Sequence, residues 1–287
     1  MKIRFGLFVA FIIIITVQSV GQNKMFSSAR QDEMVNDELI NSKLLVAALN
    51  LKEKGNYVSP QELESQATTR TGQVRVNTIG INSDKFEDYY EVQKHKTLII
   101  ARLWNQPDGQ KDILYKGCAF PITNDGICVT NHHIFRLHPD KMEDILFVVM
   151  DFEGNVYEIE EVLTGNYQDD LALFKLKEAV RLNPISLGTE PKVGDEVKLI
   201  SHPAGDFYHF SKGYITRSYW YAKNQSKRMS MTADFAVGSS GAPVCDSYGN
   251  LIGVVANTYY LPQDNSPQII VKEISPVNNI LKLIATN

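Results

Sequence analysis

Three short segments of the sequence carry side chains that could act together on a carbonyl carbon. In chain order they supply a histidine, an aspartate and a serine, namely His133, Asp170 and Ser240. A serine hydroxyl is a weak nucleophile at neutral pH, so it needs a base within hydrogen-bond reach, and that base needs an acceptor that fixes its tautomer. We therefore expect His133 to act as the general base, Asp170 as its orienting acid and Ser240 as the nucleophile.

The serine lies in a loop of small residues, Val-Gly-Ser-Ser-Gly-Ala-Pro, at 237–243. Because Gly238 has no side chain, the backbone there can turn so that its N–H and the N–H of Ser240 point at one position. Two N–H groups arranged in this way form an oxyanion hole, and the loss of one such donor typically costs about 100- to 1,000-fold in rate. We expect the backbone of Gly238 and Ser240 to provide it.

These segments resemble the signatures of the trypsin-like serine peptidases, and they are more similar to the bacterial HtrA-type branch than to the digestive enzymes. The similar stretches are Gly-Cys-Ala-Phe at 117–120, Thr-Asn-His-His-Ile at 130–134, Asp-Leu-Ala-Leu at 170–173 and Gly-Ser-Ser-Gly-Ala-Pro at 238–243. Each candidate residue follows a residue of its own type. The register of the signatures selects the second member every time: His133, Asp170 and Ser240, and not His132, Asp169 and Ser239.

The resemblance extends over about residues 95–287 and implies an all-β fold, the chymotrypsin-like double β-barrel, with the site in the cleft between the barrels. It implies a serine endopeptidase that hydrolyses peptide bonds of exported or extracellular proteins through an acyl-enzyme intermediate, without a cofactor. We expect the PDZ module that HtrA-type enzymes usually append to be absent, because the residues after Ser240 are needed to complete the second barrel. A non-catalytic peptide-binding module of the same fold is the alternative.

Two features depart from the trypsin-like pattern. Ala242 stands where many members have glycine, at a position beyond the oxyanion donors. The Asn-His-His run at 131–133 is also similar to bacterial dipeptidyl-peptidases, in which a large helical insertion blocks the cleft. The stretch between Asp170 and Ser240 is too short for that insertion, so we expect internal cleavage of the substrate.

Two groups of residues are candidates for substrate recognition. Asp234 lies six residues before Ser240, and in the resemblance to trypsin this position lies at the base of the primary specificity pocket, where a carboxylate would favour Lys or Arg. The alternative is that Asp234 caps a turn. The strand with Ala256, Asn257 and Thr258 is expected to pair with extended substrate backbone. It has no histidine where glutamyl-specific relatives place one, so acidic specificity is not expected.

The N-terminus has the pattern of a secretory signal peptide. Lys2 and Arg4 precede an apolar run at 5–17, and small residues follow at 19–21. This run is shorter than the roughly 20 residues that a membrane span needs. We expect residues 1–21 to be removed, leaving a periplasmic or secreted bacterial protein without a stable membrane span.

Residues 22–85 are predicted to form a helical extension and linker ahead of a peptidase domain at 90–287. The apolar spacing predicts a helix over 31–55, and Ser59 followed by proline and a glutamate three residues on predicts the start of a second helix. A polar linker follows over 68–83. The extension has three possible roles: an inhibitory propeptide, a partner-docking arm, or a brace that packs on a barrel.

From about residue 90 the apolar spacing shortens to that of β-strands separated by turns, which indicates a barrel or sandwich. A short terminal helix is predicted over 275–284. The expected strands cover 97–104, 127–130, 145–150, 171–176, 196–200, 213–216 and 251–256.

Composition excludes some functions. The net charge is −4 and there is no basic run that could follow a phosphate backbone, so nucleic acid is not an expected partner. The three cysteines, Cys118, Cys128 and Cys245, read mainly as small buried apolar residues, although a bridge between the first two is conceivable. The histidines at 132, 133 and 138 lack the spacing of a zinc site, so no metal is expected. The oligomeric state stays open.

Overall fold

The computed structural model describes residues 34–137, 143–177, 182–263 and 266–285. The expected signal peptide at 1–21 and His138 lie outside the described residues. Every element discussed below lies in one compact unit that begins at Asp37. Within the described ranges, no helix is both long and apolar enough to cross a membrane.

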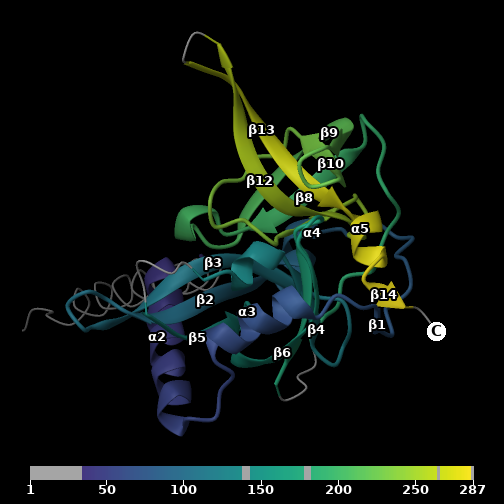
Figure 1. The fold of residues 1–287 in the computed structure, drawn as a ribbon. Coiled ribbons are helices and arrows are strands. Elements are labelled where there is room, and N and C mark those ends of the chain that lie inside the picture. The colour runs from purple at the N-terminus through teal and green to yellow at the C-terminus, as the bar shows by residue number, and fades with distance from the viewer. Residues whose placement is uncertain (1–33, 138–142, 178–181, 264–265, 286–287) are drawn as a thin grey trace, which may run out of the picture. The chain divides into compact units, whose positions relative to one another are not determined.

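Two closed β-barrels, each of six antiparallel strands, form most of this unit (Figure 1). The strand order is β2-β3-β4-β7-β6-β5 in the first barrel and β10-β13-β12-β11-β8-β9 in the second. The expected double β-barrel is therefore confirmed. The strands of the first barrel are β2 (Leu98–Asn105), β3 (Lys111–Pro121), β4 (Ile127–Thr130), β5 (Glu143–Met150), β6 (Val156–Asn166) and β7 (Leu171–Leu176). Those of the second are β8 (Glu196–Ser201), β9 (His209–Tyr221), β10 (Ser226–Met231), β11 (Pro243–Cys245), β12 (Leu251–Gln263) and β13 (Ser266–Pro276).

Strand β2 is mostly apolar because both of its faces are buried, and its one charged residue, Arg102, is itself only 3% exposed. Leu98 and Ile100 belong to the main hydrophobic cluster of the first barrel. Ile99 points to the opposite face and packs in a second cluster with Leu44 of helix α2 (Asp37–Lys54). Burying one such side chain contributes about 1.5–3 kcal/mol, so α2 adds to the stability of the barrel it covers.

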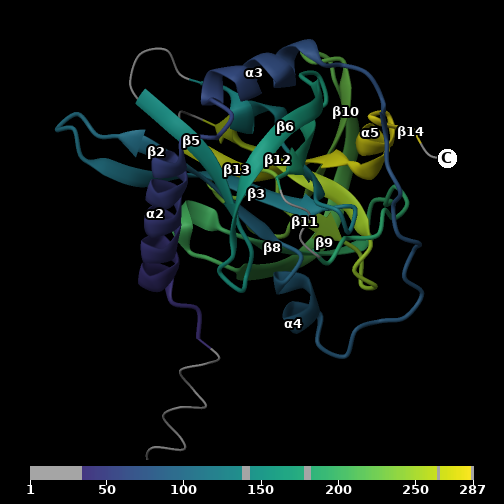
Figure 2. The same ribbon diagram turned by 90° about the horizontal axis from the view of Figure 1, so that it is seen from below.

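The N-terminal extension packs on the first barrel (Figure 2). Helix α3 (Pro60–Thr69) begins after Ser59, whose Oγ accepts a hydrogen bond from the Glu62 N–H at 3.1 Å, so the predicted cap is confirmed. Leu63 and Ala67 of this helix are buried in the main cluster of the first barrel. The extension is therefore part of the same hydrophobic core as the strands.

The remaining elements are short, and one pair of them joins segments near the two ends of the unit. Strand β1 (Val74–Arg75) pairs in parallel with β14 (Ile284–Ala285), and helix α4 (Tyr89–Lys94) precedes β2. The terminal helix predicted over 275–284 is shorter than expected: α5 spans Val277–Leu281, because β13 continues to Pro276 and β14 follows the helix.

All three cysteines are free and buried, which confirms their interpretation as small apolar residues. Cys118 and Cys128 do not form the bridge that their positions around a hairpin made conceivable. Burial raises the pKa of the Cys118 thiol to about 12, so this group stays protonated and unreactive.

Candidate active site

One open cavity is lined by His133, Asp170 and Ser240 together with residues from both barrels. His133 lies in the short 3-10 helix η1 (His132–Phe135) that follows β4, and Asp170 lies in the turn between β6 and β7. Ser240 lies in the loop before β11 of the second barrel. The structure thus brings together the three residues that the sequence motifs selected.

The Asp170 carboxylate holds His133 at two points. Its Oδ2 lies 2.8 Å from His133 Nδ1, and its Oδ1 accepts a hydrogen bond from the His133 backbone N–H at 3.0 Å. Asn131, which is fully buried, donates its Nδ2 to the Asp170 carbonyl at 2.9 Å. These bonds fix both the ring and the backbone of His133, whose side chain stays 42% exposed in the cavity.

Asp170 itself has a left-handed backbone conformation, with φ at +54°. Aspartate adopts this region more readily than most residues, because its short polar side chain can form local hydrogen bonds. The conformation directs the Asp170 carboxylate toward His133, while the preceding Asp169 points elsewhere.

In the loop at 237–243, a glycine with positive φ lies two residues before Ser240. Gly238 has φ at +98°, and a Cβ there would lie 2.6 Å from the His202 carbonyl oxygen, so glycine is required. Among the described residues, the N–H groups of Gly238 and Ser240 donate to no other backbone oxygen, whereas those of Ser239 and Gly241 are paired with Ala236 and Val255. Two N–H groups in this loop are therefore available to a ligand.

Each candidate residue forms a doublet with the residue of the same type before it, and the first member of each doublet lies outside the cavity and has structural partners. His132 donates its Nε2–H to the Ala67 carbonyl of α3 at 3.1 Å, and burial lowers the pKa of its ring. Ser239 is fully buried and donates to Ser201 Oγ at 3.0 Å. Asp169 is 3% exposed and accepts from Ser226 Oγ at 2.5 Å.

Of the residues expected to recognise substrate, three line the cavity and one does not. Ala256, Asn257 and Thr258 of β12 are part of its wall. Asp234 lies outside it, with a side chain 84% exposed and 3.8 Å from Lys272 Nζ. The interpretation of Asp234 as the base of the pocket is corrected here: Ala233 and Phe235 on either side are buried, so the residue between them points to solvent.

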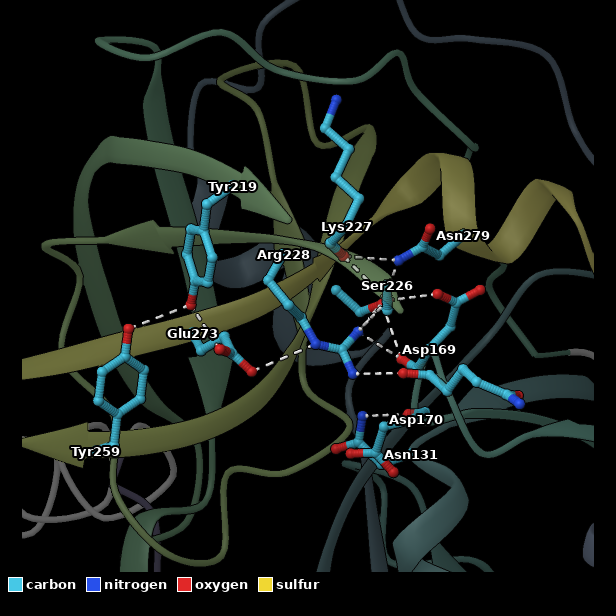
Figure 3. Close-up of polar contacts among 12 residues, drawn as sticks. Asn131, Asp169, Asp170, Tyr219, Ser226, Lys227, Arg228, Tyr259, Glu273 and Asn279 are labelled. Carbon is cyan, nitrogen blue, oxygen red and sulfur yellow. Dashed lines mark hydrogen bonds and ion pairs between the residues drawn. The ribbon is translucent and has the colours of Figure 1, made fainter. Parts of the chain in front are cut away.

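Two charged residues that the motifs did not select form part of the cavity wall instead. Arg228 of β10 and Glu273 of β13 are only 2% and 4% exposed, and Arg228 Nε lies 3.3 Å from Glu273 Oε1, an ion-pair contact without hydrogen-bond geometry (Figure 3). Glu273 also accepts a hydrogen bond from the Tyr219 hydroxyl at 2.5 Å. Burial raises the pKa of the Glu273 carboxyl, while Tyr219 and Arg228 oppose this shift.

Within the described ranges, no three His, Cys, Asp or Glu side chains gather so that they could hold a metal ion.

Comparison with known proteins finds a family match over the middle of the chain. A model of the trypsin-like peptidase domain matches residues 117–254. Anti-sigma-I factor RsgI9 of Acetivibrio thermocellus is 24% identical over 165 residues, which cover 57% of this chain and 22% of that protein. Protease Do-like 5, chloroplastic, of Arabidopsis thaliana is 30% identical over 155 residues, which cover 50% of this chain and 48% of that protein. The chain thus spans less than half the length of both curated relatives.

A solved structure shares the fold. The HtrA-type protease AlgW with a decapeptide aligns with a TM-score of 0.54 and 17% sequence identity, covering 76% of this chain and 65% of that one. The resemblance to trypsin-like peptidases that the sequence predicts, and within them to the HtrA type, is confirmed.

Proposed function

We propose that the protein is a serine endopeptidase. The observation that carries this proposal is the joint geometry of the cavity: His133 is held by both oxygens of Asp170, Ser240 lies in the same wall, and two free N–H groups lie beside it. The trypsin-like domain match over these residues supports the same chemistry.

In the proposed reaction, Ser240 Oγ attacks the peptide carbonyl carbon while His133 Nε2 takes the hydroxyl proton. Asp170 keeps the other ring nitrogen protonated and stabilises the imidazolium that forms. The carbonyl oxygen becomes an oxyanion and accepts hydrogen bonds from the N–H groups of Gly238 and Ser240. His133 then gives its proton to the leaving amine, which leaves an acyl-enzyme. Attack by water, again with His133 as base, releases the new carboxylate and restores Ser240.

The substrate class that the cavity suits is an extended peptide or protein segment. Strand β12 is bonded to the β11 segment as far as Val255, whose N–H donates to the Ala242 carbonyl at 3.0 Å. Among the described residues, Asn257 and Thr258 pair with β13 alone and Ala256 lies at the register shift before them, so the edge of β12 that faces away from β13 is open to a substrate strand. AlgW, whose structure contains a decapeptide, offers a parallel for this mode. The signal-peptide pattern supports action on exported or extracellular proteins.

We also infer that the helical extension is a brace rather than a removable propeptide. Gln66 Oε1 of α3 accepts a hydrogen bond from the Val162 N–H at 2.8 Å, and the Arg70 carbonyl accepts one from the Gly165 N–H at 2.8 Å. Both donors belong to β6, where the pairing with β7 is irregular. Without the extension these N–H groups and the apolar side chains beneath α3 would lose their partners. The N-terminus of active protein should therefore stay ahead of Asp37 during prolonged incubation, as N-terminal sequencing would show.

The proposal is tested with purified protein that starts near Gln22 and retains the extension. We expect it to cleave unfolded casein and to react with a fluorophosphonate, a reagent for activated serines. Peptide binding without cleavage and without labelling would instead favour the alternative of a non-catalytic peptide-binding module.

A further inference from the structure

The turn that carries Asp170 belongs to the first barrel but is held by the second. Arg228 of β10 donates from Nη1 to the Asp169 carbonyl at 2.8 Å and from Nη2 to the Gln168 carbonyl at 3.0 Å. These are the two carbonyl groups that directly precede Asp170. Figure 3 shows the guanidinium of Arg228 lying between this turn and the Glu273 carboxylate. The buried guanidinium therefore spans the junction of the barrels.

Other residues near the C-terminal end of the chain add to this attachment. Ser275 Oγ donates to the Asp169 carbonyl at 3.0 Å and accepts from Arg228 Nη1 at 3.1 Å. Lys282 Nζ lies 3.1 Å from Asp169 Oδ2. Asp169 is thus held through its carbonyl and its carboxylate at once, which leaves the next residue little freedom to rotate.

The other end of Arg228 faces the substrate cavity. Its Nε contacts the Glu273 carboxylate at 3.3 Å, and both side chains are part of the cavity wall. Only a guanidinium has the planar set of donors that reaches two carbonyls on one side and a carboxylate on the other; a lysine ammonium acts as a single point charge. An arginine at position 228 can therefore make all of these contacts at once, whereas a lysine there could not.

We propose that Arg228 is a positioning residue for Asp170, and that Glu273 holds the Arg228 guanidinium in the orientation that this requires. The inference rests on the proposed function, since it concerns the same reaction. Arg228 touches neither His133 nor Ser240 in any contact described above; it acts through the Gln168 and Asp169 carbonyls, which set the left-handed turn at Asp170 and so the two bonds from its carboxylate to His133.

The test compares Arg228→Lys with Arg217→Lys, the same change at an exposed arginine on the neighbouring strand β9. Active sites are counted by fluorophosphonate titration, and kcat and KM are measured per active site on one peptide substrate. We expect kcat of Arg228→Lys to fall about 10- to 100-fold, the effect of a small misplacement of a catalytic group, with a smaller change in KM. Arg217→Lys should match the unchanged protein.

Two milder variants keep the test decisive if Arg228→Lys does not fold. Ser275→Ala removes one bond to the Asp169 carbonyl, and Glu273→Gln keeps an acceptor for Arg228 but removes the charge. Both should lower kcat per active site by a few-fold. If all variants that fold keep kcat per active site within two-fold of the unchanged protein, Arg228 stabilises the fold only and the inference is overturned. If the unchanged protein itself neither labels nor cleaves, the proposed function fails instead.

Discussion

Three residues that line the cavity and the three that directly precede them in the sequence are of the same types, histidine, aspartate and serine. At the cavity, the Nε2 side of His133 and the N–H groups of Gly238 and Ser240 have no structural partners among the described residues. In contrast, the preceding residues His132, Asp169 and Ser239 are each bonded to a carbonyl, hydroxyl or ammonium group of another element. Side chains of one type therefore either line the cavity or pack in the interior, according to the partners that the backbone position gives them.

The largest difference in kcat is expected between substitutions at Ser240 and at Ser239. Ser240→Ala is expected to reduce kcat by about six orders of magnitude, because the whole nucleophilic route is lost. Its matched control, Ser239→Ala, should retain activity and lose about 1 kcal/mol of unfolding free energy, since a buried hydrogen bond to Ser201 is removed. Kinetics on a peptide substrate and urea unfolding measure the two effects. Equal losses of activity in both variants would contradict the assignment.

The second largest difference in kcat is expected between substitutions at Asp170 and at Asp169. Asp170→Asn is expected to lower kcat about 10,000-fold, because an amide in place of the carboxylate favours the wrong tautomer of His133. Asp169→Asn should act mainly on stability, by weakening the contacts with Lys282 and Ser226, and should lower kcat only a few-fold because the Asp169 carbonyl keeps its bonds to Arg228 and Ser275. Active-site titration together with thermal unfolding distinguishes these outcomes. A larger kinetic loss at Asp169 would show that the motif register is wrong.

The glycine of the loop should come third. In Gly238→Ala the added Cβ would lie 2.6 Å from the His202 carbonyl oxygen and 3.0 Å from the Ala204 nitrogen, at a φ of +98° that disfavours any side chain. The loop must shift and one oxyanion donor is displaced, so kcat should fall about 100- to 1,000-fold. Gly194→Ala, at a glycine with positive φ in open space, is the control for backbone strain alone. Similar kinetic losses in both would argue against an oxyanion site in this loop.

The smallest effect concerns a buried histidine beneath that loop. Burial lowers the pKa of His202 from 6.5 to about 3, so the unfolded chain binds a proton that the folded chain refuses between these values. Stability should therefore be complete above pH 6.5 and fall as the pH drops toward 3, by up to about 1.4 kcal/mol per pH unit. His202→Asn, which keeps an acceptor for the Tyr208 N–H, should flatten this slope in urea unfolding, and His209→Asn at an exposed site should not. An unchanged slope in His202→Asn would contradict the prediction.

Much of the site could be predicted because its groups lie in short local motifs. The register of these motifs selected three residues that line the cavity, and the apolar spacing located seven of the strands. Asp234 was misplaced because counting residues along a loop assumes a backbone path that the sequence does not specify. The fold of the extension onto the first barrel was left open for a similar reason, since an apolar stripe does not name the surface it covers.

The contact between Arg228 and Glu273 could not be foreseen from the sequence. The two residues lie on β10 and β13, whose pairing depends on the closure of the second barrel. Their proximity to the Asp170 turn depends further on how the barrels meet, a relation between segments far apart in the chain. Local patterns predict elements and motifs, whereas such long-range contacts follow only from the assembled fold.

The nucleophile is identified by the site of covalent labelling with a fluorophosphonate, located by mass spectrometry of the digested protein. We predict a single labelled serine, Ser240, with labelling lost in Ser240→Ala and retained in Ser239→Ala. Absence of labelling in correctly folded protein, or labelling at Ser239, would contradict the assignment of Ser240 as the nucleophile and of Ser239 as a packing residue.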